Sequence, residues 1–265
     1  DGVQPELNRI PRVMTIAGSD SGAGAGIQAD LKTFAALGVY GTSVLTAITA
    51  QNTQRVTAVL ELPVDLIQAQ IDSVLSDIGT DVVKTGMLSS AAIIKVVADK
   101  LKEYEIKELV VDPVMVAKGG DRLLQEEATE TLRSTLIPLA KVVTPNRYEA
   151  EVIVGHEVKD LDDARDAAKE IVDMGANVVV VKGGHIDGPA TDILFDGKEF
   201  RAFTAPRLVT TNTHGTGCTF ASATAAGLAK GMSIRESVGA AKKYITEAIR
   251  NAFPMGHGHG PLNHF

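Results

Sequence analysis

Short runs of β-branched residues alternate with longer amphipathic segments through most of this sequence. Strand-like runs occupy residues 13–17, 42–49, 82–83, 109–111, 142–143 and 178–181. Segments with helical spacing occupy residues 27–37, 64–78, 89–104, 126–136, 162–174, 219–230 and 234–251. This alternation predicts an α/β fold in three layers, a mostly parallel sheet with helices on both faces. The pair Asp196-Gly197, between two short apolar runs, predicts a hairpin with a type I′ turn.

One domain accounts for almost the whole chain. Residues 13–265 carry the alternation without a linker or repeat, and residues 1–12 form an N-terminal extension that lacks the apolar core of a signal peptide. The formal net charge of -7, without a basic run, argues against nucleic acid or an anionic membrane as a partner. The single cysteine excludes an internal disulfide and fits the reducing cytoplasm, where we expect the protein.

Polar residues follow each predicted strand. Ligands of open parallel sheets bind beyond the carboxyl ends of the strands, so these positions are candidate site residues. They are Gly18-Ser19-Asp20, Gln51-Asn52, Thr85-Gly86-Met87, Asp112-Pro113, Thr144-Pro145-Asn146, Lys182-Gly183-Gly184 and the segment 212–219. Ordinary turns would also place polar residues here, but they would not require a carboxylate, a lysine and a glycine-rich turn together.

The glycine-rich segment 212–219 lies immediately before a predicted helix. Gly215 and Gly217 permit backbone conformations in which successive amides point toward one place, and a helix N-terminus adds positive potential there. We therefore predict an anion site in this turn. Cys218 lies inside that field, which predicts a thiol pKa below its ordinary value. The alternative interpretation is a tight connection followed by a small buried cysteine.

The remaining candidates favour phosphoryl transfer over other nucleotide chemistry. No complete dinucleotide fingerprint or Walker lysine is present. Asp112 and Glu149 could bind Mg²⁺ directly or through water, and Lys182 could contact phosphate oxygens. Taken singly, Asp112 suits an Asp-Pro turn and Glu149 suits the first turn of a helix. Their joint occurrence at predicted strand ends favours the metal site.

The motifs together resemble those of the hydroxymethylpyrimidine/phosphomethylpyrimidine kinases, which belong to the ribokinase-like superfamily. The matching stretches occur in order over nearly the whole chain: 15–20, 24–33, 50–53, 84–88, 111–115, 144–146, 182–185 and 213–219. The resemblance implies a ribokinase-like fold of eight or nine strands. It also implies ATP-dependent phosphorylation of hydroxymethylpyrimidine, and then of its monophosphate, in thiamine biosynthesis.

The resemblance further implies a pyrimidine site. In such a kinase Asp30 and Gln51 hydrogen-bond the aminopyrimidine ring, and Gly18, Met87 and Val114 pack around it. Small molecules are therefore the expected binding partners. We also expect the protein to form a homo-oligomer, a dimer.

A phosphate site is implied as well. Asp112 and Glu149 lie on the Mg²⁺ side, and Gly215-Thr216-Gly217 forms the anion hole beside Cys218, the candidate base. The residues expected at the ATP phosphates are Asn146, Lys182, Thr213 and Gly217. The loop 118–121 is expected to act as a lid.

Two alternatives remain open on the sequence. A pyridoxine or pyridoxal kinase of the same subfamily carries a similar glycine and cysteine turn, although Gln51 and Lys182-Gly183-Gly184 favour the pyrimidine enzyme. A pyrimidine-binding regulator on the same fold would have no use for the set of Asp112, Glu149, Lys182 and Cys218.

Overall fold

The computed structural model describes residues 9–265, so the predicted extension falls largely outside the described residues. Within them the strands are β1 (Arg12–Asp20), β2 (Tyr40–Gln51), β3 (Val56–Glu61), β4 (Val82–Thr85), β5 (Leu109–Val111), β6 (Val142–Val143), β7 (Val178–Val181), β8 (Ala190–Phe195) and β9 (Phe200–Ala205). The helices are α1 (Gly26–Ala36), α2 (Val64–Leu75), α3 (Ala91–Glu103), α4 (Ala128–Thr131), α5 (Arg147–Val154), α6 (Leu161–Asp173), α7 (Thr216–Ala229) and α8 (Ile234–Arg250). A π turn (Leu132–Leu136) and a 3₁₀ turn (Ile137–Leu139) follow α4.

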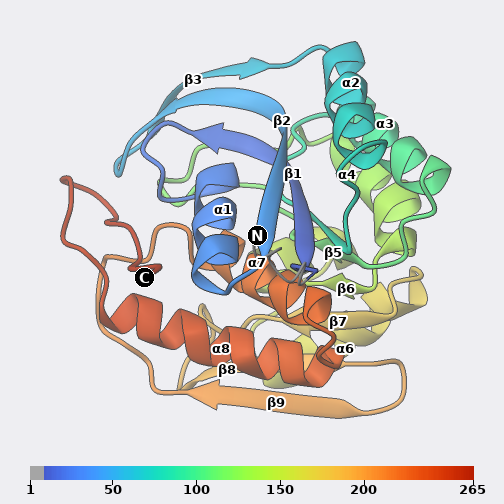
Figure 1. The fold of residues 1–265 in the computed structure, drawn as a ribbon. Coiled ribbons are helices and arrows are strands. Elements are labelled where there is room, and N and C mark those ends of the chain that lie inside the picture. The colour runs from blue at the N-terminus through green and yellow to red at the C-terminus, as the bar shows by residue number, and fades with distance from the viewer. Residues whose placement is uncertain (1–8) are drawn as a thin grey trace, which may run out of the picture.

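The strands of residues 9–265 form one sheet in the order β3-β2-β1-β4-β5-β6-β7-β8-β9 (Figure 1). The six strands from β2 to β7 in this order are parallel, and β3, β8 and β9 add antiparallel pairs at the two ends. The chain passes from β1 to β2 on one side and returns to β4 on the other. This reversal opens a crevice at the carboxyl ends of β1 and β4. The predicted α/β fold is confirmed.

Helices cover both faces of the sheet (Figure 1). Neighbouring residues of a strand point to opposite faces. Val13 and Val82 accordingly pack beneath α1, α7 and α8, whereas Met14 and Val83 pack beneath the helices of the other face. The two cores explain why the central strands read as continuous apolar runs rather than as alternating ones.

Four of the helices, α3, α5, α6 and α8, begin at a residue whose side chain caps them. Ser233 accepts a hydrogen bond from the amide of Glu236, whose carboxylate accepts one from the amide of Ser233, and this capping box starts α8. Ser90 caps α3 through the amide of Ile93. Among the helices of residues 9–265, none has the length and apolar character needed to cross a membrane.

Three local predictions were wrong. Strand β3 was missed because it is an edge strand with four consecutive exposed residues, which hides the expected alternation. The predicted helix 126–136 is a regular α-helix only over Ala128–Thr131, and Pro138, which has no amide hydrogen, lies in the turn that ends it.

The third error concerns the β8–β9 hairpin. A type I′ turn needs positive φ at both central residues, but φ is positive at Gly197 and not at Asp196. The connection is instead four residues long. The Asp196 carboxylate accepts hydrogen bonds from the amides of Lys198 (2.9 Å) and Glu199 (2.8 Å) and thereby closes the turn.

Candidate active site

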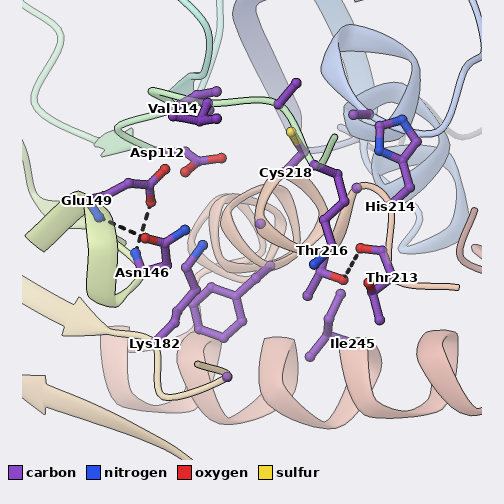
Figure 2. A pocket seen from close by; sticks show the side chains of 18 of the residues that line it. Asp112, Val114, Asn146, Glu149, Lys182, Thr213, His214, Thr216, Cys218 and Ile245 are labelled. Atoms are coloured by element: carbon purple, nitrogen blue, oxygen red, sulfur yellow. Dashed lines mark hydrogen bonds between the residues drawn. The ribbon is translucent and has the colours of Figure 1, made fainter. Parts of the chain in front are cut away.

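A cavity of about 750 Å³ opens at the carboxyl end of the sheet. Of the residues to which the sequence and the family resemblance assign a role in binding or catalysis, all except Asp30 line it: Gly18, Gln51, Met87, Asp112, Val114, Asn146, Glu149, Lys182, Thr213, Gly215, Thr216, Gly217 and Cys218. Figure 2 shows Asp112, Glu149 and Lys182 on one side of the cavity and Thr213 and Thr216 on the other. The parallel strands therefore bring together residues that are far apart in the sequence.

The glycine-rich turn is built as the start of α7. Gly215 has a φ of 88°, and a Cβ there would lie 1.8 Å from the carbonyl oxygen of Gly24, so glycine is required. Both the amide and the hydroxyl of Thr216 donate to the carbonyl of Thr213, at 3.3 and 2.6 Å. Thr219 then makes the first helical hydrogen bond, to the carbonyl of Gly215 (2.9 Å).

Two amides are left available at this helix start. Among the described residues no hydrogen bond is formed by the amides of Gly217 and Cys218. Both residues line the cavity, and the helix dipole adds positive potential at this end of α7. The turn can therefore bind an anion such as a phosphate group.

A lysine and a carboxylate face the same turn. A Cβ at Gly217 would lie 3.1 Å from Lys182 Nζ and 3.9 Å from Asp112 Oδ2, so both side chains reach this glycine. The backbone of Lys182 is fixed beside the start of α5, because its backbone amide donates to the carbonyl of Pro145 at 2.9 Å. The ammonium group can contact a phosphate bound at the turn.

Glu149 lies in the first turn of α5. Asn146 caps this helix, accepting from the Glu149 amide at 2.8 Å, and the Glu149 carboxylate accepts from the Asn146 amide at 2.9 Å. Burial raises the pKa of Glu149 to about 7, opposed by Lys182 and increased by Asp112. The backbone amide and the side-chain oxygen of Asn146 are therefore both committed to the cap, as expected for a helix that begins at Asn146.

The two carboxylates suit a divalent cation. Asp112 Oδ2 is buried and has no hydrogen-bond partner among the described residues, and such an atom calls for a cation or a bound water. Within residues 9–265 no group of three or more potential metal ligands exists. Two carboxylates fit Mg²⁺, which usually keeps several waters and takes further oxygens from phosphates.

The prediction of a low thiol pKa at Cys218 was wrong. The residue is partly exposed to the cavity, but burial raises its pKa to about 12. Lys84 opposes this rise, whereas Asp30 and Asp112 add to it. Desolvation of the thiolate therefore outweighs the positive potential of the turn, and the thiol is protonated at neutral pH.

The placement of Asp30 corrects another prediction. Asp30 is fully buried and does not line the cavity, so it does not meet a ring bound there. Its oxygens accept from Lys84 Nζ (2.9 and 3.0 Å), Thr15 Oγ1 (2.6 Å) and Ser222 Oγ (2.6 Å). Lys84 is the signal that was missed, because a lysine within a strand of valines needs a buried carboxylate partner.

The ring end of the cavity is shaped by Gly18. A Cβ there would lie 2.8 Å from Met87 Sδ, so glycine leaves room for the methionine side chain in its present position. Gln51 is the last residue of β2, and its backbone amide donates to Ser21 Oγ at 2.8 Å. This part of the cavity combines the apolar side chain of Met87 with the polar residue Gln51, which suits a polar aromatic ring.

Another part of the cavity was missed in the sequence. It is lined by residues after β9 and by one face of α8: Pro206, Leu208, Ile245, Thr246 and Ile249. The spacing of Ile245 and Ile249 in α8 is also that of residues facing a protein core. The sequence therefore does not distinguish a cavity wall from a core face here. A mostly apolar wall beside Lys182 suits a nucleobase.

The family model and the curated relatives agree on one family of enzymes. A family model described as phosphomethylpyrimidine kinase matches residues 20–263. The thiamine biosynthesis bifunctional protein ThiED of Geobacter sulfurreducens is 55% identical over 253 residues, which make up 95% of this chain and 52% of that protein. The hydroxymethylpyrimidine/phosphomethylpyrimidine kinase of Bacillus subtilis is 50% identical over 258 residues, 97% of this chain and 95% of that protein.

The fold is shared with a solved vitamin kinase. The crystal structure of an ADP complex of Bacillus subtilis pyridoxal kinase has a TM-score of 0.91 and 43% identity, covering 97% of this chain and 98% of that one. The chain thus spans about half of the Geobacter protein but nearly all of both Bacillus proteins.

Proposed function

This chain belongs to the phosphomethylpyrimidine kinase family, and on that premise we propose that it phosphorylates hydroxymethylpyrimidine with ATP and then converts the monophosphate to the diphosphate. The family relation makes it a phosphotransferase, and thiamine biosynthesis is the process that the related names give. The observation that carries the proposal is the surroundings of Gly217. Lys182 Nζ and Asp112 Oδ2 both lie close to this glycine, and the amides of Gly217 and Cys218 are free to bind an anion there.

The pyrimidine occupies the part of the cavity between Gly18, Met87 and Val114. Gln51 hydrogen-bonds the aminopyrimidine, because an amide can donate to a ring nitrogen and accept from an amino group. This orientation directs the hydroxymethyl group toward the turn at Gly215.

ATP occupies the rest of the cavity. The apolar face of α8 packs against the base, and Lys182, Asn146 and Thr213 contact the phosphates. The substrate oxygen attacks the γ-phosphorus while the bond to the β–γ bridging oxygen breaks, and the hydroxyl proton leaves to a phosphate oxygen or to water. The amides of Gly217 and Cys218 and the ammonium of Lys182 stabilise the charge on the transferring group, in a reaction that depends mainly on positioning and electrostatics.

Asp112 and Glu149 would hold Mg²⁺, directly or through water. The ion would supply positive charge that neutralises the phosphates. Its binding favours the ionised form of Glu149, whose pKa is raised to about 7 without it. We assign Cys218 a smaller share than the sequence suggests, because its thiol is protonated and a loose transition state needs little help from a base.

Pyridoxal kinase is the second candidate, favoured by the close likeness in fold described above. Fold likeness alone does not fix the substrate. Gln51 supports the pyrimidine, since it lines the cavity and carries a side-chain amide that can hydrogen-bond an aminopyrimidine. A regulator that binds the pyrimidine without catalysis would not need Lys182 and Asp112 together. A dimeric state and a cytoplasmic location are further expectations, which sedimentation and cell fractionation would test.

ADP release from ATP and Mg²⁺, measured with hydroxymethylpyrimidine, its monophosphate or pyridoxal, tests this function. We expect the highest kcat/KM with the pyrimidines. Lys182→Gln should abolish turnover, whereas Lys159→Gln, at an exposed lysine paired with Glu157, serves as the matched control and should not. Release that occurs only with pyridoxal, or with no added acceptor, would refute the assignment.

A further inference from the structure

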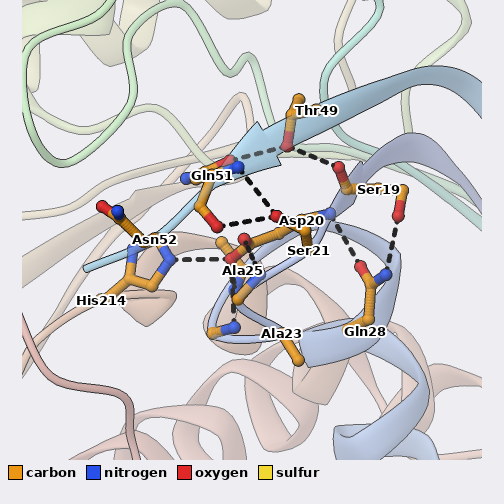
Figure 3. Close-up of polar contacts among 12 residues, drawn as sticks. Ser19, Asp20, Ser21, Ala23, Ala25, Gln28, Thr49, Gln51, Asn52 and His214 are labelled. Carbon is orange, nitrogen blue, oxygen red and sulfur yellow. Dashed lines mark hydrogen bonds and ion pairs between the residues drawn. The ribbon is translucent and has the colours of Figure 1, made fainter. Parts of the chain in front are cut away.

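A buried histidine and carboxylate join two loops at the edge of the cavity (Figure 3). His214 Nε2 lies 2.8 Å from Asp20 Oδ2, and the two residues are only 5% and 2% exposed. They are 194 positions apart in the sequence. None of the roles given above uses this pair.

Asp20 organises the loop that follows β1. Its Oδ1 accepts from the Gly22 amide (2.8 Å), and its Oδ2 accepts from the amides of Gly24 (3.0 Å) and Ala25 (2.8 Å). Burial alone would raise the pKa of Asp20, but the hydrogen bonds from His214 and these amides lower it. The carboxylate is therefore ionised and can only accept, so Nε2 of His214 is the donor.

His214 lies directly before the anion turn. A Cβ at Gly24 would lie 2.2 Å from the His214 ring, and a Cβ at Gly215 would lie 1.8 Å from the Gly24 carbonyl oxygen. The two loops thus interlock at glycines, with the histidine ring between them. The amide of His214 also donates to the carbonyl of Gly260 (3.1 Å). A shift of the His214 ring would therefore shift Gly215.

The residues on either side of Asp20 contact the ring-binding segment (Figure 3). Ser21 Oγ donates to the Gln51 carbonyl at 2.7 Å and accepts from the Gln51 amide at 2.8 Å. Thr49 Oγ1 donates to the Ser19 carbonyl at 2.7 Å. A path of hydrogen bonds and intervening peptide bonds therefore leads from Gln51, through Ser21, Asp20 and His214, to the anion turn.

We propose that Asp20 and His214 are positioning residues, which hold the anion turn at a fixed distance from the bound pyrimidine and couple pyrimidine binding to nucleotide binding. Neither touches the reacting atoms. The inference rests on the proposed function, because it assigns the ring to Gln51 and the phosphate to the turn. A small displacement of the turn lowers the rate more than it weakens pyrimidine binding, since the turn acts on the phosphoryl group in the transition state.

Two substitutions of His214 separate its donor from its shape. His214→Phe keeps a planar ring but cannot donate, whereas His214→Gln places an amide donor near the position of Nε2. We expect the phenylalanine variant to lose on the order of 10²-fold in kcat with less than about a threefold change in KM for hydroxymethylpyrimidine. The glutamine variant should recover most of that loss.

His156→Phe is the matched control. His156 Nε2 also bonds a carboxylate, Glu170 Oε1 at 2.7 Å, but this pair is on the surface, 47% and 44% exposed. Neither residue lines the cavity. The same substitution there should leave kcat unchanged, so a fall in rate at His214 reflects its location rather than loss of any histidine–carboxylate bond.

The double variant Asp20→Asn/His214→Phe separates positioning from stability. The single phenylalanine variant leaves a buried charge with one donor fewer, which destabilises the fold. Asparagine removes that charge and keeps one oxygen, which can accept from the Gly24 and Ala25 amides as Asp20 Oδ2 does, so the double variant should melt closer to the wild type than the single one. Its kcat should nevertheless remain low, and this result is expected even if the single variant does not fold.

Coupling between the two sites supplies a readout that a purely structural role would leave unchanged. In the wild type, ADP should lower the Kd for hydroxymethylpyrimidine by a factor in the range of about 5 to 150, and the folded double variant should lose most of this factor. A folded double variant with wild-type kcat and coupling would overturn the proposal. If the wild type does not act on hydroxymethylpyrimidine at all, the proposed function fails first, and the two failures are therefore distinct.

Discussion

Replacement of Cys218 by serine tests how far a thiolate takes part in catalysis. With a pKa of about 12, the thiol would be ionised to a fraction of only about 3 × 10⁻⁵ at a pH near 7.5, compared with roughly a tenth for a free thiol. General-base help worth ~10²–10⁴ in rate requires a base that is available at the working pH. We therefore expect Cys218→Ser to lose less than about tenfold in kcat, a smaller loss than the sequence alone suggests.

The single cysteine makes the thiol directly measurable. Thiolate absorbance in the ultraviolet should stay negligible from about pH 6 to about pH 10, and the rate of alkylation by iodoacetamide should keep rising with pH over this range without levelling off. The same titration with an ATP analogue and Mg²⁺ bound tests whether the loaded site changes this. Cys218→Ala controls for loss of packing at the start of α7.

A titration midpoint for Cys218 below about pH 8.5, the pKa of a free thiol, would show that burial does not dominate the pKa of this thiol. A kcat loss of roughly 10²-fold or more in the serine variant, with KM unchanged, would restore the base role that the sequence suggests. The two results together would mean that the turn's positive potential prevails over desolvation.

Three further predictions follow from the cavity. Gln51→Met should raise KM for hydroxymethylpyrimidine by the equivalent of about 1–3 kcal/mol, because buried ring groups lose their partner, and an unchanged KM would remove Gln51 from the ring site. The affinity for Mn²⁺ should increase as pH rises through about 7 and then level off, because the metal requires an ionised Glu149 whose pKa is about 7. Glu149→Gln should flatten this pH dependence. A wild-type affinity that does not depend on pH would remove Glu149 from the metal site. Amides of the loop 118–121 should exchange more slowly with nucleotide and pyrimidine bound than without, and equal exchange would argue against a lid.

The raised pKa of Glu149 also has a consequence for stability. The metal-free folded protein binds more protons than the unfolded chain between the ordinary value of 4.5 and about 7. This group's contribution to the free energy of unfolding is therefore fully present below about pH 4.5 and is lost as pH rises through about 7. Differential scanning calorimetry of wild type and Glu149→Gln without metal would measure that difference.

Much of the fold could be predicted because its central strands are buried on both faces. The valines at 178–181 gave an unambiguous strand, and the spacing of the helices followed from their apolar stripes. β3 could not be found in the same way, since an edge strand has no continuous core face to mark it. The β8–β9 turn was misassigned because the Asp196 side chain closes it, an interaction that the dipeptide alone does not reveal.

The site divides along similar lines. Residues such as Asp112 and Lys182 could be predicted because they follow strands, and the sheet then brings them to one edge. Asp30 was misplaced because its role depends on Lys84, a partner 54 positions away in another element. The pKa of Cys218 depends on burial by the surrounding elements, and the His214–Asp20 contact depends on two loops meeting. Neither is a property of a local segment.

The products formed from hydroxymethylpyrimidine test the central claim most directly. Chromatography or phosphorus NMR of a reaction with the purified protein, excess ATP and Mg²⁺ would follow them over time. We predict that the monophosphate appears first and is then converted to the diphosphate. About two ATP should be consumed for each diphosphate formed. Formation of no phosphorylated pyrimidine, while pyridoxal is phosphorylated under the same conditions, would contradict the account.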